Sequence, residues 1–227
     1  MRHLVRTYLP AWLRYLLTVL LFWPTVLLAR LLSWLAPSWR RQYDRVHARV
    51  VLGAAPVLAA DVRRLAREEG VVAVVNLCRE WVAHRELYAA LQLQALHLPT
   101  IDFDVPALDY LLRGAAFVAR HARAGRSVYV HCKAGRGRST CVVLAYYALF
   151  EGVEPSAAHA RIAAARPHIS RKWDAPEVLR CWQLRRALDA AGDGVAQAFL
   201  AAAAAGRQAV VEGVASTSDG DIVLLSE

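Results

Sequence analysis

The sequence lacks the residue pairs that hold most metal and redox centres. Its four cysteines are scattered, and no two of them form a C-x-x-C pair. This argues against a metal knuckle and a thioredoxin-type pair, and it suits a reducing compartment. We therefore expect neither a metal nor a cofactor. Ligand spacing is also missing from the histidines His84, His97, His121, His159 and His168.

Acidic residues are nearly absent from the first 50 positions, which carry eight Arg and one Asp. Residues 51–227 carry 20 Lys and Arg against 18 Asp and Glu, so most of the net charge of +9 belongs to the N-terminal segment. A basic and apolar segment favours a membrane surface with anionic lipid. A nucleic-acid binder more often has a basic face on its folded domain, so we expect no nucleic-acid partner.

One long apolar run, AWLRYLLTVLLFWPTVLLARLLSWLA, covers residues 11–36. Extended through Arg30, it reaches about the twenty residues that span a bilayer. Trp12 and Trp34 stand near its ends, where interfacial aromatic residues are found. A cleaved signal peptide is disfavoured, because the run is too long and lacks a small-x-small cleavage site. We expect membrane attachment through residues 11–36.

The form of this attachment stays open between two alternatives. A transmembrane helix and an interfacial helix or hairpin broken at Pro24 fit the pattern equally well. Three Arg residues precede the apolar core and four follow it. Under the positive-inside rule this slight bias predicts a membrane-associated protein whose catalytic domain faces the cytoplasm.

Apolar strand patterns alternate with helical patterns after residue 42. We expect strands at 50–53, 71–77, 95–98 and 127–131, and helices at 61–69, 86–93, 106–123, 140–150, 155–166 and 174–188. This alternation predicts an α/β fold with a central, mainly parallel sheet flanked by helices, behind an N-terminal membrane helix. The predicted parts are a membrane-attachment segment (1–42), a catalytic domain (43–190), and an Ala-rich helix with a disordered tail (191–227).

The motif HCKAGRGRS at 131–139 carries the chemistry. The spacing of Cys132 and Arg138 is weak evidence alone, because a chain so rich in Arg matches it by chance nearly as often as not. The context strengthens it: an apolar strand leads in, small residues fill the loop, and a helix follows. Such a loop directs backbone N–H groups and a helix dipole at a phosphate. The predicted substrate-binding residues are Lys133, Ala134, Gly135, Arg136 and Gly137.

The two polar ends of this loop have distinct chemical roles. Backbone N–H groups that bind a phosphate also stabilise a thiolate at Cys132, whose free pKa would be about 8.5. Arg138 offers a planar fork to two phosphate oxygens. Lys133 and Arg136 are either solvated loop charges or readers of further anionic groups on the substrate.

HCKAGRGRS resembles the signature loop of the protein tyrosine phosphatase superfamily, in its dual-specificity branch. Within that branch the sequence is more similar to the mitochondrial-type phosphatidylglycerophosphate phosphatases. The resemblance covers roughly residues 43–185. It rests on VVLGAAP at 50–56, TID at 100–102, YVHCKAG at 129–135 and ARPHIS at 165–170.

The resemblance implies a mechanism for the residues of the motif. Cys132 would attack phosphorus and form a thiophosphate intermediate, and Asp102 would protonate the leaving oxygen and then activate water. Ser139 would stabilise the departing thiolate. His131 would hold the loop and help lower the thiol pKa.

Two departures from the subgroup leave assignments open. The general-acid loop is about one residue shorter and holds two acids, so Asp104 competes with Asp102. In the segment NLCREW at 76–81, only Glu80 matches the more acidic loop of the subgroup. Cys78 in that segment is predicted to be a buried structural thiol in preference to a redox partner of Cys132.

The expected substrate is a phosphate monoester on a phospholipid headgroup, such as phosphatidylglycerophosphate or a phosphoinositide. The alternative is a dual-specificity protein phosphatase that acts on phosphotyrosine and on phosphoserine or phosphothreonine. A catalytically inactive phosphate-binding module is disfavoured by the intact Cys132, Arg138, Ser139 and Asp102. The sequence does not determine the oligomeric state.

Overall fold

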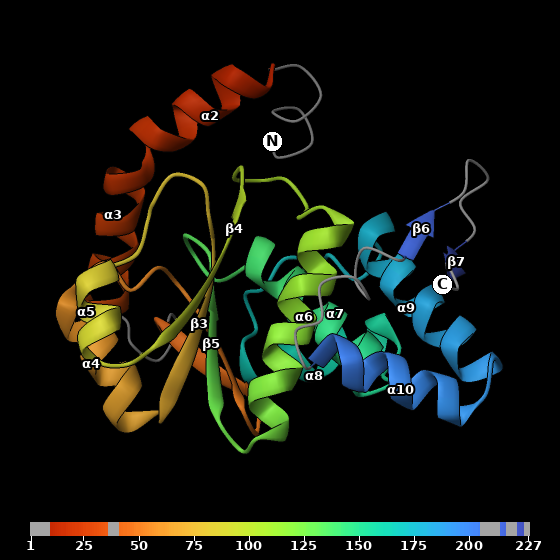
Figure 1. The fold of residues 1–227 in the computed structure, drawn as a ribbon. Helices are drawn as coiled ribbons and strands as arrows, with labels where there is room; N and C mark the ends of the chain where they lie inside the picture. Colours follow the sequence, from red (N-terminus) through yellow and green to blue (C-terminus); the bar gives the residue numbers. More distant parts are fainter. Residues whose placement is uncertain (1–9, 36–40, 205–213, 217–221, 225–227) are drawn as a thin grey trace.

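The computed structural model describes residues 10–35, 41–204, 214–216 and 222–224. Its centre is a five-stranded sheet in the order β1-β2-β5-β3-β4, with helices on both faces (Figure 1). Four strands run parallel, and the edge strand β1 pairs antiparallel with β2. The predicted α/β sheet flanked by helices is confirmed. Its strands are β1 (Tyr43–His47), β2 (Val50–Gly53), β3 (Val71–Cys78), β4 (Gln94–Thr100) and β5 (Ser127–His131).

The central strands are continuous apolar runs because both faces of the sheet are covered. All five residues of β5 are buried, and so are seven of the eight residues of β3. β5 lies between β2 and β3, so that His131 pairs with Gly53 on one side and with Asn76 on the other. The carboxyl end of β5 therefore opens at the middle of the sheet.

The helices divide into two layers (Figure 1). On one face α4 (Ala59–Glu68) and α5 (Arg85–Ala90) cover a small core that includes Val51, Val74 and Tyr129. The larger core lies on the opposite face, and α10 adds an outer layer there by packing on α6 and α9. The helices of this second layer are α6 (Leu108–Arg123), α7 (Arg138–Phe150), α8 (Pro155–Ala165), α9 (Pro176–Ala190) and α10 (Asp193–Ala204).

Several helix ends differ from the sequence prediction by one to three residues, and three of them have a clear local reason. α5 stops at Ala90, since Gln92 adopts a left-handed backbone with φ 53° before β4 begins. α6 starts at Leu108, because the extended Ala107 separates it from Pro106. α7 starts at Arg138, immediately after Gly137, so the predicted helix gains its first turn from the motif itself.

The C-terminal region contains a helix and a short two-stranded ribbon. The Ala-rich helix is present as α10. Beyond it, β6 (Val214–Ser216) and β7 (Ile222–Leu224) pair as antiparallel strands. The disordered tail that the sequence predicts from Ser216 onward stays a prediction, because most of it falls outside the described residues. Residues 217–221 lie outside the described part of the chain.

The apolar N-terminal run forms two helices, α2 (Ala11–Leu20) and α3 (Phe22–Leu35), instead of one. They meet at an angle of 47°. The bend lies three residues before the predicted break at Pro24, because a proline has no N–H for the carbonyl one turn earlier, at Leu20. Within the described residues no single helix has the length and hydropathy of a membrane span, whereas this bent pair reaches both when its helices are taken together.

Both helices contact the α/β domain. On α3, Phe22 and Val26 are buried in the larger core, and Arg30 donates two hydrogen bonds to the Asp61 carboxylate at 2.6 and 3.2 Å. On α2, Arg14 lies 2.5 Å from Asp104. α3 therefore lies beside α4, and α2 arches from the start of α3 above the sheet (Figure 1).

We predict that α3 is held by its buried side and not by its exposed one. Phe22 is 2% exposed and Leu27 on the same helix is 62% exposed. Phe22→Ala should weaken the docking of α3 by about 3 kcal/mol, which is the usual cost of such a cavity. Hydrogen exchange of the amides of residues 22–35 should become roughly a hundredfold faster. Leu27→Ala is the matched control, and equal exchange in the two variants would contradict the docked arrangement.

Candidate active site

The motif forms a loop between the end of β5 and the start of α7. Its position follows from the sheet, because β5 ends at the middle and α7 begins directly at Arg138. The loop thus receives the positive end of the helix dipole. α7 is apolar and buried over almost its whole length, which fixes the helix under the loop.

Cys132 is buried at the first position of this loop. The Ser139 hydroxyl donates a hydrogen bond to the Cys132 sulfur at 3.3 Å. Burial acts to raise the pKa of the Cys132 thiol, but the Arg138 guanidinium and the Ser139 hydroxyl outweigh it and bring this pKa below its ordinary value. A lowered pKa increases the fraction of Cys132 present as the thiolate, which is the nucleophilic form.

Arg138 is held in a fixed orientation inside the site. Its two terminal nitrogens donate to the Glu80 carboxylate at 2.9 and 2.8 Å, and one of them also donates to the Thr100 carbonyl at 2.8 Å. The Nε atom is buried and has no acceptor among the described residues. One N–H of the guanidinium therefore remains for a ligand oxygen.

Glu80 is a residue whose role the sequence did not reveal. Its side chain is fully buried and is bound by Arg138 in the two-pronged geometry that carboxylates and guanidinium groups prefer. The only signal was the match of Glu80 to the acidic loop of the related subgroup. Sequence position alone does not show that this loop, 58 residues before Arg138, folds back onto the motif.

The structure separates the two candidate acids. Asp102 lies 2.7 Å from the Lys133 ammonium and 3.1 Å from Arg138, whereas Asp104 pairs with Arg14 on α2. Between them Phe103 adopts a left-handed backbone with φ 71°, which is rare for an aromatic residue and directs its neighbours to different partners. Asp102 is the acid that contacts the loop.

The charge state of Asp102 follows from its neighbours. Burial acts to raise the pKa of its carboxyl group, but Arg138 and Lys133 outweigh burial and hold this pKa below its ordinary value. In the absence of a ligand the side chain is a carboxylate bound to two cations. Its proton must therefore be acquired when a ligand arrives.

His131 lies under the loop between two aromatic rings. It stacks on Tyr129 with ring centroids 5.4 Å apart and meets the edge of Trp81 at 5.7 Å. Burial lowers the pKa of His131 to about 3, although the Cys132 backbone acts in the opposite sense. A neutral ring supplies no positive charge, and the groups that lower the thiol pKa in the structure are Arg138 and Ser139. The role of His131 in holding the loop and helping to lower this pKa stays a prediction.

The middle of the loop is pressed against β2. Gly135 has φ +63°, and a Cβ placed on it would lie 2.3 Å from the Gly53 carbonyl carbon. Buried Arg166 donates to the Gly135 carbonyl at 2.9 Å and pairs with Asp44 at 2.6 Å. The role of Arg166 was not evident from the sequence, which offered only the ARPHIS motif.

The ARPHIS segment also forms hydrogen bonds with the second half of the phosphate-binding loop. The Arg136 side chain donates to the His168 carbonyl at 2.7 Å, and the Ser170 N–H donates to the Arg136 carbonyl at 2.7 Å. Lys133 is mostly buried and turns toward Asp102. Neither cation is a freely solvated loop charge.

These residues line a pocket of about 350 Å³ that we call the catalytic pocket. It brings together Cys132, Arg138, Asp102 and Lys133, and α3 contributes Thr25 to its wall. Asp104 also lines it. Among the described residues no group of three or more His, Cys, Asp or Glu side chains is placed to hold a metal ion.

Cys78 lies at the end of β3 as a free, buried thiol. Burial raises its pKa well above the ordinary value. It is therefore a poor nucleophile, and the structure has no disulfide between Cys78 and Cys132. This agrees with a structural thiol.

The contact of the loop with β2 gives a test of the loop geometry. Gly135→Ala should lower the free energy of unfolding by about 3 kcal/mol, because a Cβ there collides with backbone and the φ is positive. At Gly137 the nearest atom to a new Cβ is the Ser170 hydroxyl at 3.9 Å. Gly137→Ala should cost less than about 1 kcal/mol. Urea unfolding of both variants measures the difference, and a larger loss at Gly137 would refute the packing described.

Comparison with known proteins agrees with this geometry. The family model "Dual specificity phosphatase, catalytic domain" matches residues 55–183. The rat (Rattus norvegicus) protein "Phosphatidylglycerophosphatase and protein-tyrosine phosphatase 1" is 35% identical over 177 residues, which are 75% of this chain and 91% of that protein. A crystal structure of PTPMT1 has a TM-score of 0.60 at 32% identity and covers 66% of this chain and 99% of its own.

A crystal structure of PTPMT1 in complex with PI(5)P has a TM-score of 0.58 at 30% identity, and covers 66% of this chain and 98% of its own. The family match includes the loop, Asp102, Glu80 and Arg166, and it leaves α2 and α3 outside. The chain belongs to the dual specificity phosphatase family and is a cysteine-based hydrolase of the protein tyrosine phosphatase type.

Proposed function

We propose that this protein is a membrane-attached phosphomonoesterase that acts on a phospholipid headgroup, such as phosphatidylglycerophosphate or a phosphoinositide. The observation that carries the proposal is the position of the apolar helix pair, since α3 forms part of the catalytic pocket through Thr25. The rat relative is named as a phosphatidylglycerophosphatase, and the related crystal structure contains PI(5)P, which supports the same substrate class. A phosphatase with its pocket beside an apolar surface is suited to a substrate that resides in a membrane.

The exposed side chains of the helix pair support membrane attachment. The large apolar ones are Trp12, Leu16, Leu17, Val19, Leu20, Leu21, Trp23, Leu27, Leu28, Leu31, Trp34 and Leu35. So many exposed apolar side chains on two adjacent helices are unusual for a soluble monomer. The bend and the ion pairs of Arg14 and Arg30 with the domain favour an interfacial helix pair over a span. The Arg-rich flanks of this segment are attracted to anionic lipid, which is concentrated in the cytoplasmic leaflet, and this supports a catalytic domain on the cytoplasmic side.

The first chemical step proposed is attack by the Cys132 thiolate on phosphorus. Loop N–H groups and the free Nε of Arg138 bind the phosphoryl oxygens, and a P–S bond forms as the P–O bond to the leaving group breaks. The incoming dianion competes with Asp102 for Arg138 and Lys133. Its negative charge raises the pKa of Asp102, which can then carry the proton that the leaving oxygen takes.

The second step is hydrolysis of the cysteinyl-phosphate intermediate. Asp102, now a carboxylate, accepts a proton from water while the water oxygen attacks phosphorus. The P–S bond breaks and the electron pair returns to the Cys132 sulfur. Ser139 stabilises this thiolate through the hydrogen bond that its hydroxyl already donates.

A dual-specificity protein phosphatase is the second candidate function. One observation favours it, since the rat relative is also named as a protein-tyrosine phosphatase. In that case the helix pair would serve location only. The two functions differ in whether the lipid part of the substrate contributes to catalysis.

The proposed role of Asp102 as general acid can be tested by mutation. Asp102→Asn should lower kcat by about 10²-fold or more on an alkyl phosphate, because the leaving alkoxide then lacks a proton donor. Asp104→Asn removes a carboxylate of the same size on the same turn and should change kcat less than threefold. Steady-state kinetics with both variants measures this, and the reverse order would assign the role to Asp104.

The proposed substrate class can be tested by comparing phospholipids with phosphopeptides. With purified full-length protein, kcat/KM for phosphatidylglycerophosphate or a phosphoinositide in anionic vesicles should exceed that for phosphotyrosine and phosphothreonine peptides by at least tenfold. Phosphate release is the measurement, and Cys132→Ser is the inactive control. Faster turnover of phosphopeptides than of every phospholipid tested would establish the alternative function.

A further inference from the structure

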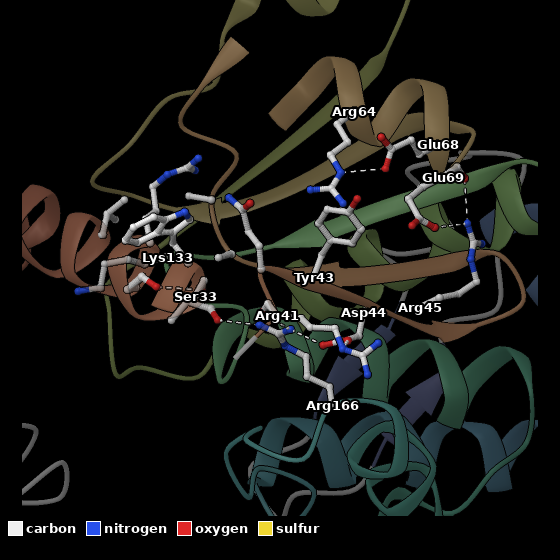
Figure 2. A pocket seen from close by; sticks show the side chains of 18 residues that line it. Ser33, Arg41, Tyr43, Asp44, Arg45, Arg64, Glu68, Glu69, Lys133 and Arg166 are labelled. Carbon is white, nitrogen blue, oxygen red and sulfur yellow. Dashed lines mark hydrogen bonds and ion pairs between the residues drawn. The ribbon is translucent and has the colours of Figure 1, made fainter. Parts of the chain in front are cut away.

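A second and larger cavity adjoins the catalytic pocket. It has a volume of about 720 Å³ and lies between α3 and the start of the phosphatase domain (Figure 2). Lys133 and Ala134 line both this cavity and the catalytic pocket, so the two meet at the phosphate-binding loop. α3 is also common to both, with Thr25 on one side and Val26 on the other. We call this cavity the α3 cavity.

The α3 cavity carries an excess of positive charge. Six Arg and Lys side chains line it against three acids, Asp44, Glu68 and Glu69. Three of the cations are engaged in strong pairs: Arg166 with Asp44, Arg45 with Glu69, and Arg30 with Asp61 outside the lining. Lys133 belongs to the catalytic pocket through Asp102. The two remaining cations are Arg41 and Arg64.

Arg41 and Arg64 are available to an incoming anion. The Arg41 side chain is 71% exposed, and its Nε lies 3.5 Å from an Asp44 carboxylate that Arg166 already holds at 2.6 Å. Arg64 pairs with Glu68 one helical turn away, at 60% exposure, where such pairs contribute little. Figure 2 shows Arg64 above the Tyr43 ring, with Arg41 beside Asp44 below it.

The wall of the cavity that α3 forms is partly apolar. Val26, Ala29 and Trp34 line it, together with Ser33 and the already paired Arg30. A lipid whose terminal phosphate occupies the loop carries its phosphodiester one headgroup unit away, followed by acyl chains. Unengaged cations on the domain side and apolar side chains on the α3 side are complementary to that sequence of groups.

We propose that the α3 cavity is a second anion subsite, which binds the phosphodiester of a phospholipid while its terminal phosphate lies against Cys132. Arg41 and Arg64 bind the diester oxygens, and α3 directs the acyl chains toward the membrane. The inference rests on the proposed function. Because α3 lies outside residues 55–183, the match to the phosphatase family does not assign this site.

The experiment compares a substrate that has a phosphodiester with one that lacks it. The first is a short-chain phosphatidylglycerophosphate that stays monomeric in water, and the second is p-nitrophenyl phosphate. For Arg64→Gln combined with Arg41→Gln, KM for the monomeric lipid should rise about tenfold with little change in kcat. Both constants for p-nitrophenyl phosphate should stay within twofold. Arg63→Gln is the matched control, since Arg63 is an exposed neighbour on α4 outside the lining.

A variant that makes the α3 cavity more positive tests whether the rise in KM of the arginine variants is caused by misfolding. Glu68→Gln releases Arg64 and makes the cavity more positive, so KM for the monomeric lipid should fall two- to threefold. Damage to the fold does not improve binding.

Two results would overturn the inference. An unchanged KM for the monomeric lipid, with a loss of activity only on vesicles, would make the two arginines membrane-surface charges. An equal loss on p-nitrophenyl phosphate would make them structural. Hydrolysis of phosphopeptides but of no phospholipid by the parent protein would instead refute the proposed function, which is a separate and distinguishable failure.

Discussion

The active site depends on the burial of one guanidinium group, that of Arg138. Its pairing with Glu80 joins the loop after β3 to the start of α7, and its bond to the Thr100 carbonyl adds the end of β4. The same positive charge lowers the pKa of Cys132 and attracts the Asp102 carboxylate. Removing one partner of a buried ion pair generally costs about 3–5 kcal/mol, so the site and the fold share this interaction.

A second buried arginine, Arg166, holds the backbone of the loop in place. Arg166 binds two carbonyl groups of the loop and pairs with Asp44 on β1. Because Gly135 also touches Gly53, the loop is fixed to the β1–β2 side as firmly as Arg138 fixes it to the β3–β4 side. A loop held on both sides can keep its N–H groups oriented without a ligand, which is the requirement for electrostatic catalysis.

The sequence predicted the parts of this arrangement that are local. The loop, its strand and its helix are contiguous, and the strand pattern of residues 71–77 is unambiguous because both faces are covered. The partners of the loop are distant: Glu80 and Arg166 reach it only through the fold, so no local pattern reveals them. Nor does a sequence show that Phe103 turns Asp102 and Asp104 apart, or that burial keeps His131 neutral.

The N-terminal segment shows a similar limit. Its composition predicted an apolar, membrane-seeking helix, but the position of the bend and the docking of Phe22 depend on the domain against which it packs. The same holds for the ribbon of β6 and β7, since each strand is too short to be recognised without its partner. In both segments the structure depends on contacts with residues that are distant in the sequence, and these contacts cannot be read from the segment alone.

In the unliganded site Asp102 occupies the two cations that a phosphate would use. The protein thus carries its own tethered counter-ion, and every phosphate, including the inorganic product, must displace it. Such self-competition weakens the intrinsic attraction of the loop for phosphate and favours turnover over retention. Discrimination among monoesters consequently falls to the groups that surround the phosphate and not to the phosphate itself.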